Sequence, residues 1–362
     1  MKNKIEGEIT IREQIKKFAI ESLYGFDTII LIGMGRKLGI FNYLYTKGKK
    51  LPVNNDYIVV KFTPNEIIEN LGLDPKYLDA WLHLALECDI FEVDNPSEKV
   101  LRTSPYVFEL LIDCNHSSYV GGTLGAFYNI ALSQKVMLDN FKTGEPINLL
   151  QLPPEIVEDL QERSKRFGGL IQTLFANTFK DFCENLHENG MILEVGCGYG
   201  YNLETWTKIY KKARFVGIDI DPIAIASVKS MIERNNWNQR VKLYEIDVHE
   251  YKNTIQEKFD LIILNQVLHE MNLDENSKIE LFRDLYFLLK DNGILLFGES
   301  MVPDTFAPKG KFQIFDITHK FSEMGSAHFY NEKTFKEFIN TTPFSKAEFI
   351  KKGGTYFWVI KK

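Results

Sequence analysis

Residues Met191–Gly200 read MILEVGCGYG, a short apolar run that ends on a carboxylate and continues into three alternating glycines. The apolar run predicts a strand, and the residues from Asn202 to Lys212 have the pattern of a helix. Glycine adopts backbone angles that a Cβ forbids and lets the backbone approach a ligand closely. The stretch therefore predicts a ligand-binding turn between a strand and a helix, with simple chain reversal as the alternative role.

A second carboxylate lies about twenty residues beyond the glycines, at the spacing of nucleoside-binding βαβ units. Phe215–Asp219 reads FVGID and predicts a strand that ends on an acid able to bind ribose hydroxyls. The dinucleotide pattern Gly-x-Gly-x-x-Gly does not fit, because Tyr201 stands where its third glycine belongs. Glu194 would repel a pyrophosphate but attract a cationic ammonium group. A ribose, an adenine and a cationic amino-acid tail without phosphates describe S-adenosylmethionine.

The glycine turn and Asp219 together resemble class I S-adenosylmethionine-dependent methyltransferases, whose first motif is acid-x-Gly-x-Gly-x-Gly. The resemblance implies a Rossmann-like α/β domain with a seven-stranded, mostly parallel sheet and an antiparallel last strand. It also implies that Ile220 and Val248 cover the two faces of adenine and that Asp247 accepts a hydrogen bond from the adenine amino group. A helix cap is the alternative role for Asp247. The expected cofactor-binding residues are Glu194, Gly196, Gly198, Gly200, Asp219, Ile220, Asp247, Val248 and Asn265.

The fourth predicted strand of this domain, Phe259–Asn265, is nearly all apolar, as a strand covered on both faces should be. Ligands bind beyond the carboxyl ends of strands in open α/β sheets, so the residues after Asn265 should face the cofactor. His269-Glu270 follows there, and in the small-molecule O-methyltransferases, which the chain resembles, such a histidine deprotonates the acceptor hydroxyl. Glu299, at the end of the fifth strand, is the candidate carboxylate that stabilises the imidazolium. The alternative is a histidine that makes only local hydrogen bonds.

One run departs from the pattern of that O-methyltransferase family. Its members commonly carry Gly-x-Glu-Arg-Thr before the last helix, where this chain has Gly325–Tyr330, GSAHFY. The second carboxylate and the arginine are missing, and His328 is the candidate substitute. Phe315, Met324 and His328 are candidates for the wall of an apolar acceptor pocket, although aromatic residues at such spacing are more often core. The alternatives to a hydroxyl acceptor are a nitrogen or carbon acceptor, or a protein that binds the cofactor without catalysis.

The front half of the chain predicts a helix, a turn, a second helix and a two-stranded wing, which together describe a winged helix. Thr63 and Asp74 each cap a predicted helix, and short strands follow at 90–93 and 100–103. Winged helices often bind DNA, but residues 56–113 carry four basic side chains against twelve acidic ones. A phosphate backbone would reject that surface, so a DNA-binding regulator is the disfavoured hypothesis.

A winged helix in front of this methyltransferase motif resembles the small-molecule O-methyltransferases, and Leu38–Phe41 and Leu101–Ser104 carry that part of the resemblance. In that family the front domain forms a dimer and closes part of the substrate pocket. The expected domains are a winged-helix dimerisation domain at 1–115, a helical connector lining the pocket at 116–185 and a methyltransferase domain at 186–362. A plain interdomain helical core is the alternative role of the connector. The predicted function is O-methylation of a small molecule by a homodimer.

Length and composition limit the classes of protein to which the chain could belong. The 362 residues suffice for two domains, and the formal charge of −6 argues against a general nucleic-acid or anionic-membrane binder. The four cysteines show no paired metal-ligand spacing, so no metal site is expected. The first residues lack the apolar core of a signal peptide, and no apolar run reaches the roughly 18 residues of a membrane span. We therefore expect a cytoplasmic protein with reduced thiols.

Overall fold

A computed structural model describes residues 10–50, 57–114, 116, 118–129, 143 and 168–362, with gaps in the last range at 255–256, 272, 309, 311–312, 323–327, 345 and 353–354. The chain divides into two compact units, 1–132 and 133–362. The predicted connector, 116–185, is therefore shared between the two units. Of the predicted site residues, Met324 lies outside the described part of the chain.

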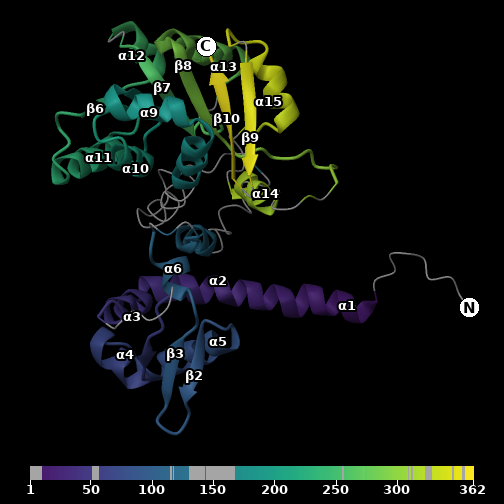
Figure 1. Cartoon of the computed structure of the whole chain (residues 1–362). Helices are drawn as coiled ribbons and strands as arrows, with labels where there is room; N and C mark the ends of the chain where they lie inside the picture. Colours follow the sequence, from purple (N-terminus) through teal and green to yellow (C-terminus); the bar gives the residue numbers. More distant parts are fainter. Residues whose placement is uncertain are drawn as a thin grey trace, which may run out of the picture. The chain divides into compact units, whose positions relative to one another are not determined.

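The N-terminal unit begins with one continuous helix (Figure 1). It consists of α1 (Ile11–Ile15), the π-helical segment η1 (Lys16–Glu21) and α2 (Ser22–Lys37). Leu31 and Ile32, close to the end of the helix, are buried. Large apolar side chains on its earlier turns are exposed: Ile11, Ile15, Phe18, Ile20, Leu23, Tyr24 and Phe26. The start of the helix thus presents an apolar surface that its own unit does not cover.

The same helix, Ile11–Lys37, is long and apolar enough to cross a membrane by length and composition alone. This differs from the sequence expectation, because the helix reaches a mean hydropathy of 1.3 over a window in which a few polar residues interrupt the apolar ones. The buried core helix of a soluble protein can have the same length and composition. The finding by itself therefore assigns no location.

The rest of the N-terminal unit contains the predicted pair of helices and pair of strands. The Thr63 side chain caps the first of these helices, and Gly72 ends it with a φ of 65°, which favours glycine. A third short strand, which the sequence did not predict, completes an antiparallel sheet in the order β1-β3-β2. The elements are α3 (Ile40–Gly48), β1 (Lys61–Phe62), α4 (Pro64–Leu71), α5 (Pro75–Glu87), β2 (Phe91–Asn95), β3 (Val100–Thr103), α6 (Val107–Leu111) and a helix at 121–129.

The C-terminal unit is built on a sheet with helices around it (Figure 1). Seven strands form this sheet in the order β6-β5-β4-β7-β8-β10-β9. Strands β4 to β8 pair in parallel, whereas β10 is antiparallel to both β8 and β9. The predicted Rossmann-like sheet with an antiparallel last strand is confirmed. The strand order reverses between β4 and β7, which is where open α/β sheets bind ligands. The strands are β4 (Met191–Val195), β5 (Arg214–Asp219), β6 (Val241–Glu245), β7 (Phe259–Asn265), β8 (Leu289–Gly298), β9 (Lys346–Lys352) and β10 (Thr355–Lys361).

Helices connect these strands, and local signals set where they begin. Asp221 caps α11 through the Ile223 amide, and Pro222 lies in its first turn, as the sequence predicts. The helices of this unit are one at 168–178, α9 (Lys180–Asn189), α10 (Tyr201–Ile209), α11 (Pro222–Arg234), α12 (Val248–Thr254), α13 (Glu275–Leu288), α14 (Gln313–Ser322) and α15 (Glu332–Ile339).

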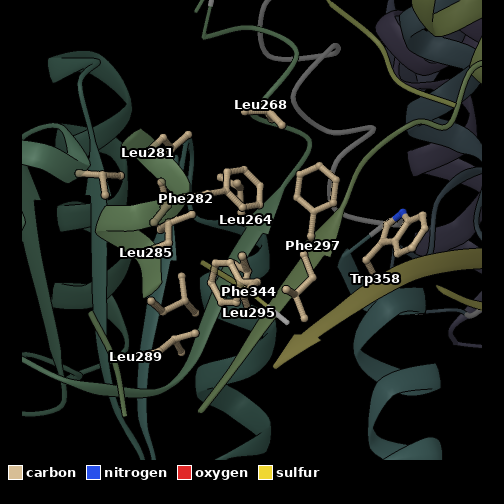
Figure 2. Close-up of a cluster of buried hydrophobic side chains, with 14 of the residues drawn as sticks. Leu264, Leu268, Leu281, Phe282, Leu285, Leu289, Leu295, Phe297, Phe344 and Trp358 are labelled. Atoms are coloured by element: carbon tan, nitrogen blue, oxygen red, sulfur yellow. The ribbon is translucent and has the colours of Figure 1, made fainter. Parts of the chain in front are cut away.

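Apolar side chains cover both faces of the sheet, which explains why the sequence of β7 is nearly all apolar. Ile262 and Leu264 belong to one buried cluster. Leu264 lies there next to Phe297 of the neighbouring strand (Figure 2). Leu261 and Ile263 belong to a second buried cluster. This alternation follows from the two-residue repeat of a strand, whose successive side chains point to opposite faces.

Replacing Phe282 by alanine should lower the free energy of unfolding by about 3–5 kcal/mol, because its fully buried ring packs in the first cluster and leaves a cavity when removed. Phe287 on the same helix is 44% exposed, and Phe287→Ala is the matched control. Urea unfolding followed by circular dichroism would measure both. A similar loss in the two variants would contradict the packing described for α13.

Candidate active site

The glycine turn after β4 requires glycine for two separate reasons. Gly196, Gly198 and Gly200 have φ values of 64°, 49° and 76°, in the left-handed region that side chains disfavour. A Cβ at Gly196 would also lie 2.6 Å from the Val267 side chain, which is closer than real contacts allow. The turn is thus held tightly against the residues that follow β7.

Glu194, the last acid before the turn, is buried, and its carboxylate is only partly satisfied. Asn202 donates to Oε1 at 3.0 Å, whereas Oε2 meets the geometry of no hydrogen bond within the described residues. Burial raises the pKa of Glu194 to about 8, and the Asn202 hydrogen bond offsets only part of that effect. An added cationic group would stabilise the ionised form. The site therefore suits the ammonium group that the sequence predicted there.

Asp219, at the end of β5, ties the glycine turn to the neighbouring strand. Its Oδ2 accepts a hydrogen bond from the Gly198 amide at 2.8 Å, and its Oδ1 accepts one from the Asp221 amide at 2.9 Å. Ile220 follows immediately and is 75% exposed, which is unusual for a large apolar side chain beside a strand end. The carboxylate and the exposed apolar surface are thus neighbours, as a bound nucleoside requires.

Asp247 lies one strand further along the same edge. The Ile246 amide donates to the Asp219 carbonyl at 2.9 Å, which keeps the ends of β5 and β6 together. Asp247 Oδ1 accepts from the Glu250 amide at 2.9 Å, so this oxygen serves as a cap at the start of α12, the alternative left open by the sequence. Val248 is buried directly after it.

The end of β7 holds two buried polar groups without partners in the part of the chain that is described, Asn265 Oδ1 and Gln266 Nε2. Gln266 has a φ of 57°, an uncommon conformation for a residue other than glycine. Gly298 of β8 lies so close that a Cβ there would be 2.2 Å from Asn265 Oδ1. One orphaned acceptor beside one orphaned donor fits a polar ligand. The sequence pointed to Asn265 but missed Gln266, because side-chain direction at a turn depends on its backbone angles.

His269 and Glu299 meet at the ends of β7 and β8. Each is 1% exposed, and His269 Nδ1 lies 2.9 Å from Glu299 Oε1. The same carboxylate accepts backbone hydrogen bonds from Ser300 at 3.0 Å and from His269 itself at 3.3 Å. The contact with Glu299 is an ion pair at hydrogen-bonding distance. Glu270 Oε1 lies 3.5 Å from the other ring nitrogen, Nε2.

The charges around His269 decide its protonation. Burial alone lowers its pKa, but the Glu299 and Glu270 carboxylates outweigh burial and raise the pKa to about 10. The ring is therefore a cation at neutral pH when no ligand charge is nearby. A cationic ligand at the same strand ends would lower this pKa and favour the neutral imidazole.

Two further rings hold His269, and the sequence predicted neither. Phe329 stacks on it, with ring centroids 4.8 Å apart and an interplanar angle of 21°. His319 of α14 meets it edge-on at 4.7 Å and 79°. His319 is itself buried, and its Nδ1 lies 2.8 Å from Ser300 Oγ. The signal that could have indicated His319 and its neighbour Asp316 is their spacing of three residues, which places both on one face of a helix whose apolar residues lie elsewhere.

Residues 193–295 match the family described as a methyltransferase domain. The match identifies a methyltransferase domain in this part of the chain. Among curated relatives, a malonyl-[acyl-carrier protein] O-methyltransferase of Legionella pneumophila is 30% identical over 115 residues. That match covers 32% of this chain and 37% of the relative, so the chain spans little more than a third of the relative's length.

Solved structures resemble nearly the whole chain. The mitomycin 7-O-methyltransferase MmcR matches 96% of this chain and 97% of its own, with a TM-score of 0.67 and 15% identity. Human N-acetylserotonin methyltransferase in complex with S-adenosylmethionine matches 99% of each chain, with a TM-score of 0.67 and 14% identity. The N,N-8-amino-8-demethyl-D-riboflavin dimethyltransferase RosA of Streptomyces davawensis matches 98% of this chain and 100% of its own, with a TM-score of 0.59 and 15% identity. At such identities the likeness concerns the fold.

Of the predicted acceptor residues that the structure describes, His328 lines a surface cavity and Phe315 does not. Phe315 is 52% exposed on α14. The His328 ring is also exposed, 4.0 Å from Glu275, while its backbone amide donates to the His269 carbonyl at 3.3 Å. A surface cavity of about 640 Å³ is lined by His328 and Phe329, so Phe329 contacts both this cavity and the His269 ring.

Binding of S-adenosylmethionine should release close to one proton from Glu194 near pH 7. Below its raised pKa of about 8 this carboxyl group is protonated in the free protein, and an ammonium group beside it lowers that pKa. Calorimetric titrations in two buffers of different ionisation enthalpy would count the protons. S-adenosylhomocysteine carries the ammonium group but no sulfonium, so it separates this release from any release at His269.

Glu194→Gln should abolish the release that the two ligands share, whereas Glu204→Gln, at a half-buried glutamate of α10 that pairs with Lys208, should leave it unchanged. Heats that do not depend on the buffer in the wild-type protein would show that Glu194 is already ionised, contrary to the effect of its burial.

Proposed function

We propose that this chain transfers a methyl group from S-adenosylmethionine to a hydroxyl oxygen of a small molecule, with His269 removing the proton of that hydroxyl. The buried His269–Glu299 pair carries the proposal. It lies at the carboxyl ends of β7 and β8, next to the strand that leads into the glycine turn. The similarity to a mitomycin 7-O-methyltransferase and to an acyl-carrier-protein O-methyltransferase supports an oxygen acceptor.

The residues at the strand ends would hold the cofactor by complementary chemistry. Glu194 would bind the ammonium group and Asp219 the ribose hydroxyls, since each is a carboxylate at the edge of the glycine turn. Ile220 and Val248 would contact adenine, with the second oxygen of Asp247 accepting from its amino group. The unpaired oxygen of Asn265 would accept a further polar group of the ligand. The bound cofactor supplies a methyl group activated by a sulfonium charge.

His269 acts as the base only in its neutral form. Without ligand its pKa of about 10 keeps it protonated at neutral pH, so a nearby positive charge is needed to lower that pKa. Glu299 then has two tasks. It keeps the proton on Nδ1, so that Nε2 is the basic nitrogen, and it stabilises the imidazolium once Nε2 has taken the acceptor proton.

Methylation of an amine nitrogen is the second candidate function. Residues 325–330 lack the second carboxylate and the arginine that the O-methyltransferase family commonly carries. RosA, a dimethyltransferase named for an amino-riboflavin, has a similar fold. A neutral amine is already nucleophilic and needs less help from a base than a hydroxyl does.

His269→Ala should lower turnover by about 10²–10⁴-fold while S-adenosylmethionine still binds, because the general base is lost and the glycine turn is not. A panel of phenols, alcohols and amines incubated with methyl-labelled cofactor would identify the acceptor, and mass spectrometry would locate the new methyl group on oxygen or nitrogen.

His83→Ala, at an exposed histidine of α5, is the control. Unchanged turnover in His269→Ala would remove the base from the proposal. Turnover on amines alone, insensitive to His269, would favour the second candidate.

We also propose that the N-terminal unit is a winged helix through which two copies of the chain form a homodimer. The exposed apolar side chains of the helix at 11–37 support this proposal, because single-chain proteins rarely leave such a stripe uncovered. A second copy, rather than a membrane, agrees with the cytoplasmic location that the composition predicts.

Phe18→Glu should convert a dimer into monomers, since it places a charge in the apolar surface where the Phe18 side chain is 69% exposed. Lys16→Glu, two residues away on the same helix, is the control and should leave the mass unchanged. Size-exclusion chromatography with light scattering would measure both. A monomeric wild-type protein, or one that floats with lipid vesicles, would overturn the dimer.

A further inference from the structure

Two consecutive residues that follow β8, Glu299 and Ser300, each contact a histidine. Glu299 lies against His269, and Ser300 Oγ lies 2.8 Å from His319 Nδ1. The second histidine comes from α14, a helix with an unusual distribution of side chains. Asp316 and His319 point inward, whereas its large apolar side chains are exposed: Ile314, Phe315, Ile317 and Phe321. The polar face of α14 therefore docks this helix beside the transfer site.

Counting donors and acceptors assigns the proton on His319. The Tyr356 hydroxyl donates to Asp316, and the Met301 amide donates to that hydroxyl at 3.0 Å. Burial raises the pKa of Asp316 to about 6, and hydrogen bonds from Tyr356 and Ser300 oppose that rise. At neutral pH the ionised carboxylate can only accept, so Ser300 donates its single proton to Asp316. The remaining contact of Ser300 must then receive a hydrogen bond, so His319 Nδ1 carries a proton whether the ring is neutral or charged.

We propose that His319 is a positioning residue of the methyl-transfer site: Ser300 and Asp316 fix its ring with the proton on Nδ1, and that ring fixes the orientation of His269 against Glu299. The proposal extends the proposed function, since it concerns the base of that reaction.

Ring packing provides the physical reason. The His269 ring is stacked on Phe329 and met edge-on by His319, and His319 also meets Phe329 edge-on at 5.1 Å and 69°. Three rings that contact one another leave His269 little freedom to rotate about χ2. This matters because the contact with Glu299 holds one ring nitrogen, whereas the packed rings hold the ring plane. A base must keep its nitrogen aimed at the acceptor proton to be effective.

Nitrogen NMR of the full-length protein with labelled histidine would test the proposal without any acceptor, because the shifts of the two ring nitrogens report which one carries the proton. His319→Asn and His269→Gln would assign the two sets of signals. In the wild-type protein at neutral pH, we expect His319 Nδ1 to be protonated. In Ser300→Ala we expect that preference to be lost and the His269 signals to shift as well.

Asp316→Asn removes the negative charge that accepts the Ser300 proton, without removing an aromatic ring. It should weaken the preference of His319 for a proton on Nδ1. Ser230→Ala, at an exposed serine of α11 whose hydroxyl donates to the Ala226 carbonyl of the same helix, is the matched control and should change neither histidine. A wild-type His319 protonated on Nε2 alone would overturn the proposal. So would His269 signals that do not respond to Ser300→Ala.

With an acceptor in hand, Ser300→Ala should reduce kcat roughly 10- to 100-fold with unchanged affinity for S-adenosylmethionine, as expected for a misaimed base. An unchanged kcat would contradict the positioning role. If His269→Ala keeps full turnover, the proposed base fails, yet the NMR result still decides whether His319 orients the His269 ring. The two proposals can therefore fail separately.

Discussion

The parallel register of the central strands is the constraint on which the rest of this structure depends. Glu194 of β4 is in register with Gly217 of β5 and Ile263 of β7, and Asn265 of β7 is in register with Gly298 of β8. Because the strands run the same way, residues far apart in sequence reach one edge of the sheet together. Glycine occurs at two of these paired positions. At Gly298 a side chain would collide with Asn265, so the register and the site impose the same choice of residue.

Burial of charge at that edge opposes folding, and the edge is organised to limit the cost. An isolated buried carboxylate is far less stable than a solvated one, so it takes up a proton or a partner. Glu194 takes the first course and Glu299 the second, since His269 lies within 2.9 Å of it. The apolar clusters on both faces of the sheet contribute the free energy of folding that offsets the cost of burying these groups. The apolar core therefore holds the site in place, because the polar contacts of the site alone would not stabilise the fold.

The sequence predicted those parts of the fold and site that depend on local patterns. Short sequence patterns predict the glycine turn, the strand that ends at Asp219 and the apolar strand before His269. Each of these patterns spans only a few neighbouring residues. The orientation of α14 was not predictable in this way. Aromatic residues at helical spacing suggested that Phe315 faced the site, but the helix turns its polar side inward. That choice depends on Ser300 and Tyr356, which belong to other strands and loops, so only the assembled structure contains the information.

The balance of charge at this edge of the sheet links the cofactor-binding residues to the His269–Glu299 pair. Asp219, Glu270 and Glu299 make the strand ends acidic, and His269 provides a positive charge there. Glu194 adds a further negative charge once a bound cation lowers its pKa. Such an edge suits a cationic ligand better than a nucleotide phosphate. In the proposed reaction His269 gains a proton as the ligand loses its sulfonium charge, so the net charge of the buried edge does not change. A transfer that keeps the total buried charge constant avoids the large desolvation penalty of creating a new buried charge. The histidine, its carboxylate and the cofactor must lie together at one enclosed edge for this compensation to occur.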